Sequence, residues 1–308
     1  MWYWIIIFLI STAVLVKSAD FLTSRAEKFG KLVGMPQFVV GVIIVSFGTS
    51  LPELASSIIA VTSGASDIVI GNVLGSNVVN ILLGLGVASI VAKPVLKMTH
   101  DLFTADMPIL VVATIIVLFT AFDGDITLLE SVLYLVGFGG YLYYMRALNK
   151  DGNNKKSTSG SAGQELLLIG IAATVLFFSA KYLIDSVISI SEITGFGTSV
   201  LAASAVALGT SLPEIAVTAA AARRGNSGIV MGNIIGSSIF NIFAIVGIAG
   251  LFGTLIVTPI TSGFILPFTV VTTLLYWLVL HDKKIVKAEG SFMILLYFVF
   301  LGKVLGLL

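Results

Sequence analysis

Cysteine is absent from this chain of 308 residues, and charge is scarce. The absence of cysteine excludes disulfides, thiolate metal sites and thiol catalysis. Only 11% of the residues are charged, against about 25% in a typical soluble domain, so water cannot be the solvent for most of the surface. The formal net charge of +1 also lacks the basic excess that nucleic-acid binding requires, so we expect no nucleic-acid partner.

Long apolar runs take up most of the sequence, which is 57% hydrophobic. A run of about 20 apolar residues is long enough to cross a bilayer. The N-terminal stretch MWYWIIIFLI lacks the basic residues of a secretory signal, so we expect a retained first helix. We predict an all-α polytopic membrane protein whose ten transmembrane helices lie near 2–22, 37–62, 68–91, 104–122, 126–147, 165–185, 196–221, 228–256, 262–280 and 290–307.

Residues 149–164, NKDGNNKKSTSGSAGQ, form a polar stretch without hydrophobic side chains of any size, which we interpret as a linker. If ten helices alternate in direction, the loops after odd-numbered helices hold fifteen of the seventeen Lys and Arg residues. The opposite side holds only Lys181 and Lys303. The positive-inside rule then places the linker in the cytoplasm and both termini outside.

The sequence GTSLPE occurs twice, at Gly48–Glu53 and again 161 residues later at Gly209–Glu214. The same offset carries Gly71, Asn72, Gly75, Ser76 and Asn80 onto Gly232, Asn233, Gly236, Ser237 and Asn241. Each half contains an odd number of predicted helices, so the second half must enter the membrane upside down. We therefore predict two inverted five-helix repeats, residues 1–148 and 165–308, joined by the linker 149–164. Inverted repeats of this kind place a substrate site near the bilayer midplane.

Glu53 and Glu214 are the acidic residues that fall well within apolar spans. A carboxylate in hydrocarbon is costly and needs a partner. No Lys, Arg or His lies at the same depth in the predicted spans, so a bound cation or a proton would have to supply it. Other acidic residues, such as Asp106 and Asp185, are expected to be solvated groups at helix ends.

The residues around both glutamates offer only oxygen ligands. Pro52 lacks an N–H and its ring collides with the carbonyl four residues earlier, so we expect a kink that frees carbonyls near Ser46–Thr49. Thr49 and Ser50 precede Glu53 by four and three residues and can share its helix face. Such donors suit Ca²⁺ or Na⁺, whereas zinc, copper and iron prefer nitrogen or sulfur. Packing glycines and hydrogen-bonding Ser, Thr and Asn are common in membrane helices, but their duplication in register around paired carboxylates argues against that alternative.

Two copies of GTSLPE…GNxxGSxxxN in inverted halves resemble the paired repeats of the sodium/calcium exchanger family, within the calcium/cation antiporters. The resemblance implies a secondary active antiporter, not an enzyme, that exchanges Na⁺ for Ca²⁺ by alternating access and carries net charge. It further implies a prokaryotic plasma-membrane protein that works as a monomer in the lipid bilayer, with Ca²⁺ and Na⁺ as transported ions and no cofactor.

The resemblance also implies a role for each motif residue. The central Ca²⁺ would be coordinated by carboxylates and backbone carbonyls, namely Glu53, Glu214, Thr49 and Thr210. Flanking Na⁺ sites would use hydroxyls and carbonyls, namely Ser50, Ser211, Ser76, Ser237, Ser46 and Ala207. The amides that close the central site would be Asn80 and Asn241. The motif regions therefore span residues 46–80 and 207–241.

Four alternatives to this interpretation remain at this level. A Ca²⁺/H⁺ exchanger would have the same fold, but the proton-coupled relatives typically carry Glu after GN, where this chain has Val73 and Ile234. Asn241 in place of the Asp found in potassium-dependent relatives argues against K⁺ co-transport. A cation channel is disfavoured because one chain holds a complete inverted pair. An intramembrane hydrolase would need a His or Lys base near the motif serines, and none lies at their depth.

Overall fold

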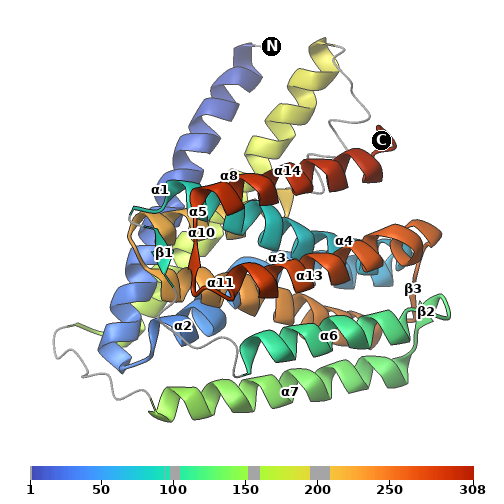
Figure 1. The fold of residues 1–308 in the computed structure, drawn as a ribbon. Coiled ribbons are helices and arrows are strands. Elements are labelled where there is room, and N and C mark those ends of the chain that lie inside the picture. Colours follow the sequence, from blue (N-terminus) through green and yellow to red (C-terminus); the bar gives the residue numbers. More distant parts are fainter. Residues whose placement is uncertain (1, 94, 98–104, 152–159, 195–208) are drawn as a thin grey trace.

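The computed structural model describes residues 2–93, 95–97, 105–151, 160–194 and 209–308, and these are mostly helical (Figure 1). Several helices continue through a π-helical segment, labelled η. The first half of the chain contains α1 Trp2–Val33, α2 Gln37–Val40, η1 Gly41–Ser46, α3 Phe47–Thr62, α4 Asp67–Val78, η2 Val79–Gly84, α5 Leu85–Val91, α6 Asp106–Thr120 and α7 Leu128–Asp151.

The second half has a comparable series of helices. It contains α8 Ala162–Thr194, α10 Leu212–Arg223, α11 Ser227–Ile239, η3 Phe240–Ile245, α12 Val246–Gly250, η4 Thr261–Ile265, α13 Leu266–Leu280 and α14 Lys287–Val304. Two antiparallel pairs of short strands join the halves at helix ends: β1 Leu96–Lys97 with β4 Lys284–Ile285, and β2 Asp125–Ile126 with β3 Leu255–Ile256.

Six helical runs among the described residues are long and apolar enough to cross a membrane: Trp2–Val33, Gln37–Thr62, Asp67–Val91, Ala162–Leu183, Ser227–Gly250 and Thr261–Leu280. The shorter α6 is also apolar. The chain is therefore a largely helical membrane protein, as predicted. The count of ten spans, the inverted repeat and the orientation of the termini stay predictions, and the expected span 196–221 lies partly outside the described residues.

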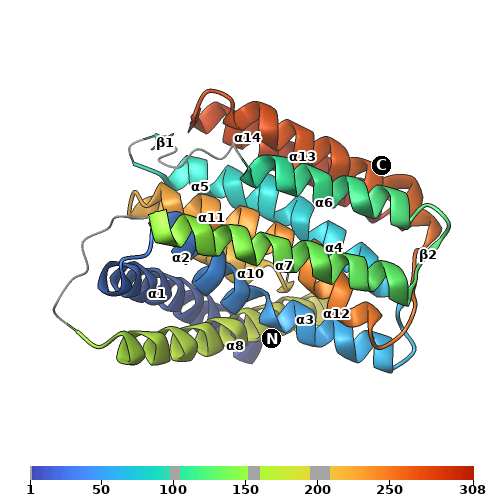
Figure 2. The same cartoon turned by 90° about the horizontal axis from the view of Figure 1, so that it is seen from below.

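The helices that carry the repeated motifs lie in the centre of the molecule. In Figure 2, α4, α10 and α11 run between the α1–α8 pair on one side and α13 and α14 on the other. All residues of α11 are buried. In Figure 1, α1 and α8 lie side by side and cross the other helices steeply. The motif residues are thus enclosed by protein on most sides.

Helix α1 continues well beyond the predicted end at residue 22, because its charged residues have ionic partners on other helices. Lys28 Nζ lies 2.5 Å from Glu165 Oε1, and Arg25 Nη1 lies 3.5 Å from Glu165 Oε2. Arg223, at the end of α10, pairs with Asp20 at 2.9 Å. These charged residues suggest a loop in the sequence, but in the structure their ion pairs hold the extended end of α1 against α8 and α10.

The prediction that Asp106 is a solvated helix-end group is wrong. Its relative exposure is 0%, and the Tyr144 hydroxyl donates a hydrogen bond of 3.2 Å to its Oδ2 atom. Asp106 begins α6, which packs against α7, α11 and α13, so this helix start is covered rather than open to solvent.

Glycines of the second motif allow two backbones to touch. A Cβ atom added to Gly41 would lie 2.9 Å from the Cα of Gly232, and one added to Gly236 would lie 2.8 Å from the Cα of Val42. Contacts this short leave no room for a side chain. Helix α11 is therefore pressed against η1, directly before the first motif.

Candidate cation site

The first motif turns its polar side toward the protein interior. Glu53 is only 2% exposed, and Thr49 and Ser50 are buried beside it, whereas Leu51 on the opposite face is 56% exposed. The helical spacing of three and four residues places these oxygen-bearing side chains on one face, as predicted from the sequence.

The backbone before Glu53 departs from a regular α-helix. Gly41–Ser46 is π-helical, a local conformation that often marks functional sites. The helix continues through Pro52, which cannot donate to the carbonyl of Gly48. The Thr49 hydroxyl donates to the carbonyls of Val45 at 3.1 Å and Ser46 at 3.2 Å. Because a hydroxyl has one hydrogen, Thr49 shares it between these two carbonyls, and the Ser46 carbonyl keeps a lone pair for another partner.

The second motif has a different local structure. Helix α10 begins at Leu212, with Ser211 at its N-cap and Pro213 in the first turn. Glu214, which is 3% exposed, therefore lies in the first turn, where free N–H groups favour a negative charge. Thr210 lies in the turn before the helix. Ala207, the expected carbonyl ligand of this copy, lies outside the described residues.

The two motifs meet in space although they are far apart in the sequence. The Ser50 hydroxyl of α3 donates a buried hydrogen bond of 2.9 Å to Oε1 of Glu214 on α10. Neither Glu53 nor Glu214 takes part in an ion pair within the described chain. The structure therefore brings a ligand candidate of one half into contact with a carboxylate of the other.

Many oxygens of the predicted ligands are buried without a hydrogen-bond partner among the described residues. A buried polar atom left in this state costs about 1–3 kcal/mol, so such atoms are rare unless something else binds them. These atoms are Glu53 Oε2, Glu214 Oε2, Ser76 Oγ, Ser237 Oγ, Asn80 Oδ1, Asn241 Oδ1, Thr210 Oγ1 and Ser211 Oγ. Cations liganded by oxygens would satisfy atoms of this kind.

The donor set fits a hard cation rather than a transition metal. The part of the chain that the structure describes contains no group of three or more His, Cys, Asp and Glu side chains that could hold a metal. Two carboxylates with neutral hydroxyl, amide and carbonyl oxygens are instead typical ligands of Ca²⁺.

Two features of the site concern residues of the repeated motif, but their local geometry is not visible in the sequence. Asn80 and Asn241 each occupy the second position of a π-helical segment, Val79–Gly84 and Phe240–Ile245, and these segments are again 161 residues apart. Asn233 is buried and its Nδ2 donates to the Glu214 carbonyl at 3.2 Å and to Thr218 Oγ1 at 2.8 Å, which fixes α11 to α10.

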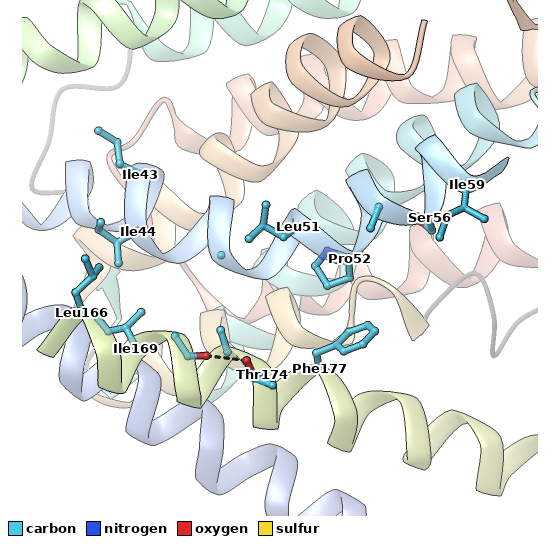
Figure 3. Close-up of a pocket in the computed structure, with 14 residues that line it drawn as sticks. Ile43, Ile44, Leu51, Pro52, Ser56, Ile59, Leu166, Ile169, Thr174 and Phe177 are labelled. Carbon is cyan, nitrogen blue, oxygen red and sulfur yellow. Dashed lines mark hydrogen bonds between the residues drawn. The ribbon is translucent and has the colours of Figure 1, made fainter. Parts of the chain in front are cut away.

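An apolar groove of about 820 Å³ lies on the outer side of α3, between this helix and α8 (Figure 3). Leu51 and Pro52 line it from α3, and Ile169, Thr174 and Phe177 line it from α8. Glu53 and Ser50 are not among its lining residues. The groove is therefore separate from the cation site and borders the face of α8.

Comparison with known proteins identifies the family of this chain. The model of the family described as sodium/calcium exchanger protein matches residues 3–146 and 165–305, so the chain belongs to the sodium/calcium exchanger family. The two matched segments leave out the whole of the predicted linker, residues 149–164.

Individual relatives match the chain over most of its length. The sodium/calcium exchanger MaX1 of Methanosarcina acetivorans is 30% identical over 96% of this chain and 97% of its own. The inner membrane protein YrbG of Escherichia coli is 28% identical over 79% of this chain and 78% of its own. A solved structure of the sodium-calcium exchanger NCX_Mj, soaked with zero Na⁺ and Ca²⁺, superposes with a TM-score of 0.83 at 27% identity, covering 96% of this chain and 97% of that one.

Proposed function

We propose that the protein is an antiporter that exchanges Na⁺ for Ca²⁺ across the plasma membrane of a prokaryote. The observation that carries this proposal is the set of buried, unpartnered oxygens around Glu53 and Glu214, contributed by both halves of the chain. Membership of the sodium/calcium exchanger family supports the choice of ions.

In this proposal the carboxylates of Glu53 and Glu214 hold the central Ca²⁺ with the backbone carbonyls of Thr49 and Thr210. The amide oxygens of Asn80 and Asn241 close that site. Na⁺ occupies flanking positions formed by hydroxyls and carbonyls of Ser50, Ser211, Ser76, Ser237, Ser46 and Ala207. The hydrogen bond from Ser50 to Glu214 supports this assignment, because it joins a proposed Na⁺ ligand to a proposed Ca²⁺ ligand.

The charge of the site couples the two ions. Two carboxylates carry a charge of −2, which one Ca²⁺ or two Na⁺ would neutralise. A further Na⁺ would leave a net charge on the loaded protein, and each such charge is worth about 2.3 kcal/mol per 100 mV of membrane potential. An empty site with two negative charges is costly to carry through the membrane, which suppresses movement without ions and makes exchange obligatory.

The proposed architecture is ten membrane helices in two inverted repeats, residues 1–148 and 165–308, with the linker 149–164 in the cytoplasm and both termini outside. The protein would work as a monomer by alternating access around a site at the bilayer midplane. Helices α1 and α8, the first of each half, would move as a gate. Their side-by-side packing and the groove between α8 and α3 support this role (Figures 1 and 3).

The test is uptake of radioactive Ca²⁺ into proteoliposomes loaded with Na⁺ and diluted into Na⁺-free buffer. We expect uptake in the wild type, and loss of uptake in Glu53→Gln and in Glu214→Gln. Asp123→Asn, which neutralises an exposed carboxylate after α6, serves as the matched control and should behave as the wild type.

Other outcomes would redirect the proposal. Uptake that ignores Na⁺ but follows a pH gradient would identify a Ca²⁺/H⁺ exchanger of the same fold. Uptake without saturation or counterflow would indicate a channel. Full activity in either glutamine variant would show that the site is elsewhere.

A further inference from the structure

Asn77 connects the two halves of the chain beside the proposed site, although the repeated sequence does not mark it. Its Nδ2 atom donates to the backbone carbonyl of Ser238 at 3.2 Å. Its Oδ1 atom accepts a hydrogen bond of 3.1 Å from Nδ2 of Asn241. All three residues are buried, with relative exposures of 2% or less.

The direction of this hydrogen-bond chain is fixed by chemistry. A backbone carbonyl can only accept, so Asn77 must turn its NH₂ group toward Ser238. Its carbonyl oxygen then faces Asn241, which must donate a hydrogen bond from its own NH₂ group. The Oδ1 atom of Asn241 is consequently turned to the other side, where it is buried and has no hydrogen-bond partner in the described part of the chain.

We infer that Asn77 is a positioning residue that keeps the amide oxygen of Asn241, rather than its NH₂ group, available to the bound cation. This inference rests on the proposed function. An amide that is free to turn over presents N–H donors to the ion for part of the time, and these repel a cation. Without Asn77 the site would retain every proposed ligand but hold one of them in the correct orientation only part of the time.

The arrangement belongs to one half only. The offset of 161 residues carries Asn77 onto Ser238, and Asn80 onto Asn241. Ser238 is too short to repeat the bridge in the opposite direction, and its hydroxyl has no partner among the described residues. Asn241, the amide ligand proposed for the second half, is therefore oriented by Asn77 of the first half. Asn80, the matching amide of the first half, has no such partner at position 238.

A double-mutant cycle between Asn77→Ala and Asn241→Asp tests the inference. A carboxylate presents an oxygen whichever way it turns, so Asp at position 241 needs no orienting partner. We expect Asn77→Ala to raise the Ca²⁺ concentration for half-maximal uptake about tenfold, with a smaller effect on the maximal rate. In the Asn241→Asp background the same substitution should cause no loss of affinity greater than about twofold, because an aspartate at position 241 has no N–H to donate to the Oδ1 atom of Asn77. Equilibrium Ca²⁺ binding to purified protein should show the same pattern.

Several results would overturn the inference. An equal loss of affinity in both backgrounds would mean that Asn77 is merely structural, and no loss in either would mean that it has no role. Loss of Ca²⁺ binding in Asn241→Asp alone would show that position 241 does not present an oxygen.

Thr269→Val controls for removal of a buried hydrogen bond, because among the described residues this hydroxyl donates to the carbonyl of Ile265, one turn earlier in the same helical run, at 2.8 Å.

Asn77→Ser, which copies the residue of the second half, replaces Asn77→Ala in the cycle if the alanine variant does not fold. Failure of the proposed function itself is recognisable separately, because the wild type would then show no Na⁺-driven Ca²⁺ uptake.

Discussion

The hydroxyl of Ser50 donates a hydrogen bond of 2.9 Å to the carboxylate of Glu214, from one motif of the chain to the other. Both side chains are buried, and this bond uses Oε1 while Oε2 of Glu214 remains without a described partner. A substitution at either residue should therefore alter the proposed ligands of both halves.

Ser50→Ala should weaken the binding of Na⁺ more than the binding of Ca²⁺. It removes a proposed Na⁺ ligand and frees the Glu214 oxygen, while the carboxylates proposed for Ca²⁺ remain. We expect the Na⁺ concentration for half-maximal exchange to rise about tenfold, the effect of losing a hydrogen bond to a charged group. The measurement is Ca²⁺ release from proteoliposomes against external Na⁺. Ser56→Ala, on the outer side of the same helix, removes a hydrogen bond to the backbone carbonyl of Glu53 and leaves its carboxylate unchanged, so it should have no such effect. Equal changes in both variants would contradict the assignment.

Gly232→Ala should destabilise the protein by about 1–3 kcal/mol, the usual cost of overpacking. The added methyl group would meet the Cα atom of Gly41 at 2.9 Å, where only backbone could yield. Thermal unfolding of the purified protein in detergent measures the effect. The control is Gly139→Ala in α7, where a Cβ would meet nothing within 4 Å. Equal melting temperatures for the two variants would show that the contact between η1 and α11 adapts easily.

Glu165→Gln should lower the melting temperature, because it removes the shared partner of Arg25 and Lys28 that ties α1 to α8. Glu165 is only 3% exposed, so water replaces this partner poorly. Added salt should reduce the difference from the wild type, since salt weakens ion pairs near a surface. Glu192→Gln changes an exposed carboxylate of the same helix and is the control. A salt-independent difference would point to a cause other than the ion pairs.

The absence of cysteine makes the predicted orientation directly testable. Gln164→Cys, at the exposed last position of the predicted linker and in the first turn of α8, should react with a membrane-impermeant maleimide only from the cytoplasmic side. Asp123→Cys, in the connection between α6 and α7, should react only from outside. The measurement compares labelling of intact cells with that of inverted vesicles, and the unmodified chain gives no background. The opposite pattern would reverse the orientation, and labelling of both positions from one side would refute the proposed arrangement of helices.

The sequence predicted helices best where their ends carry clear signals. The runs Gln37–Thr62 and Asp67–Val91 agree with the predicted spans 37–62 and 68–91. Pro36 precedes the first run, and Gly64 separates the two; in the structure Gly64 has a positive φ of 80°. The end of α1 was missed since Asp20, Arg25 and Lys28 find partners only in the folded protein. Charge alone does not distinguish a loop from a helix with ionic contacts.

The candidate site was predictable to the extent that it is repeated. Glu53 and Glu214 stood out as paired acids in apolar spans, and the structure buries both; their role in binding cations stays a prediction. Asn77 could not be found in this way, because the second copy has Ser238 at that position. The π-helical segments around Asn80 and Asn241 have no periodicity that a sequence would show, and the burial of Asp106 depends on contacts between distant helices.

Two aromatic residues are next to motif residues in the sequence, and a third packs against both of them. Phe47 directly precedes the first GTSLPE motif, Phe240 directly precedes Asn241, and their ring centroids lie 4.8 Å apart, each 5.7 Å from that of Phe138. These rings add apolar side chains to the interior next to two motif positions, and the attraction between opposite charges grows where the local dielectric constant is low. If the two carboxylates bind a cation as proposed, residues that do not touch the ion would thus contribute to its affinity.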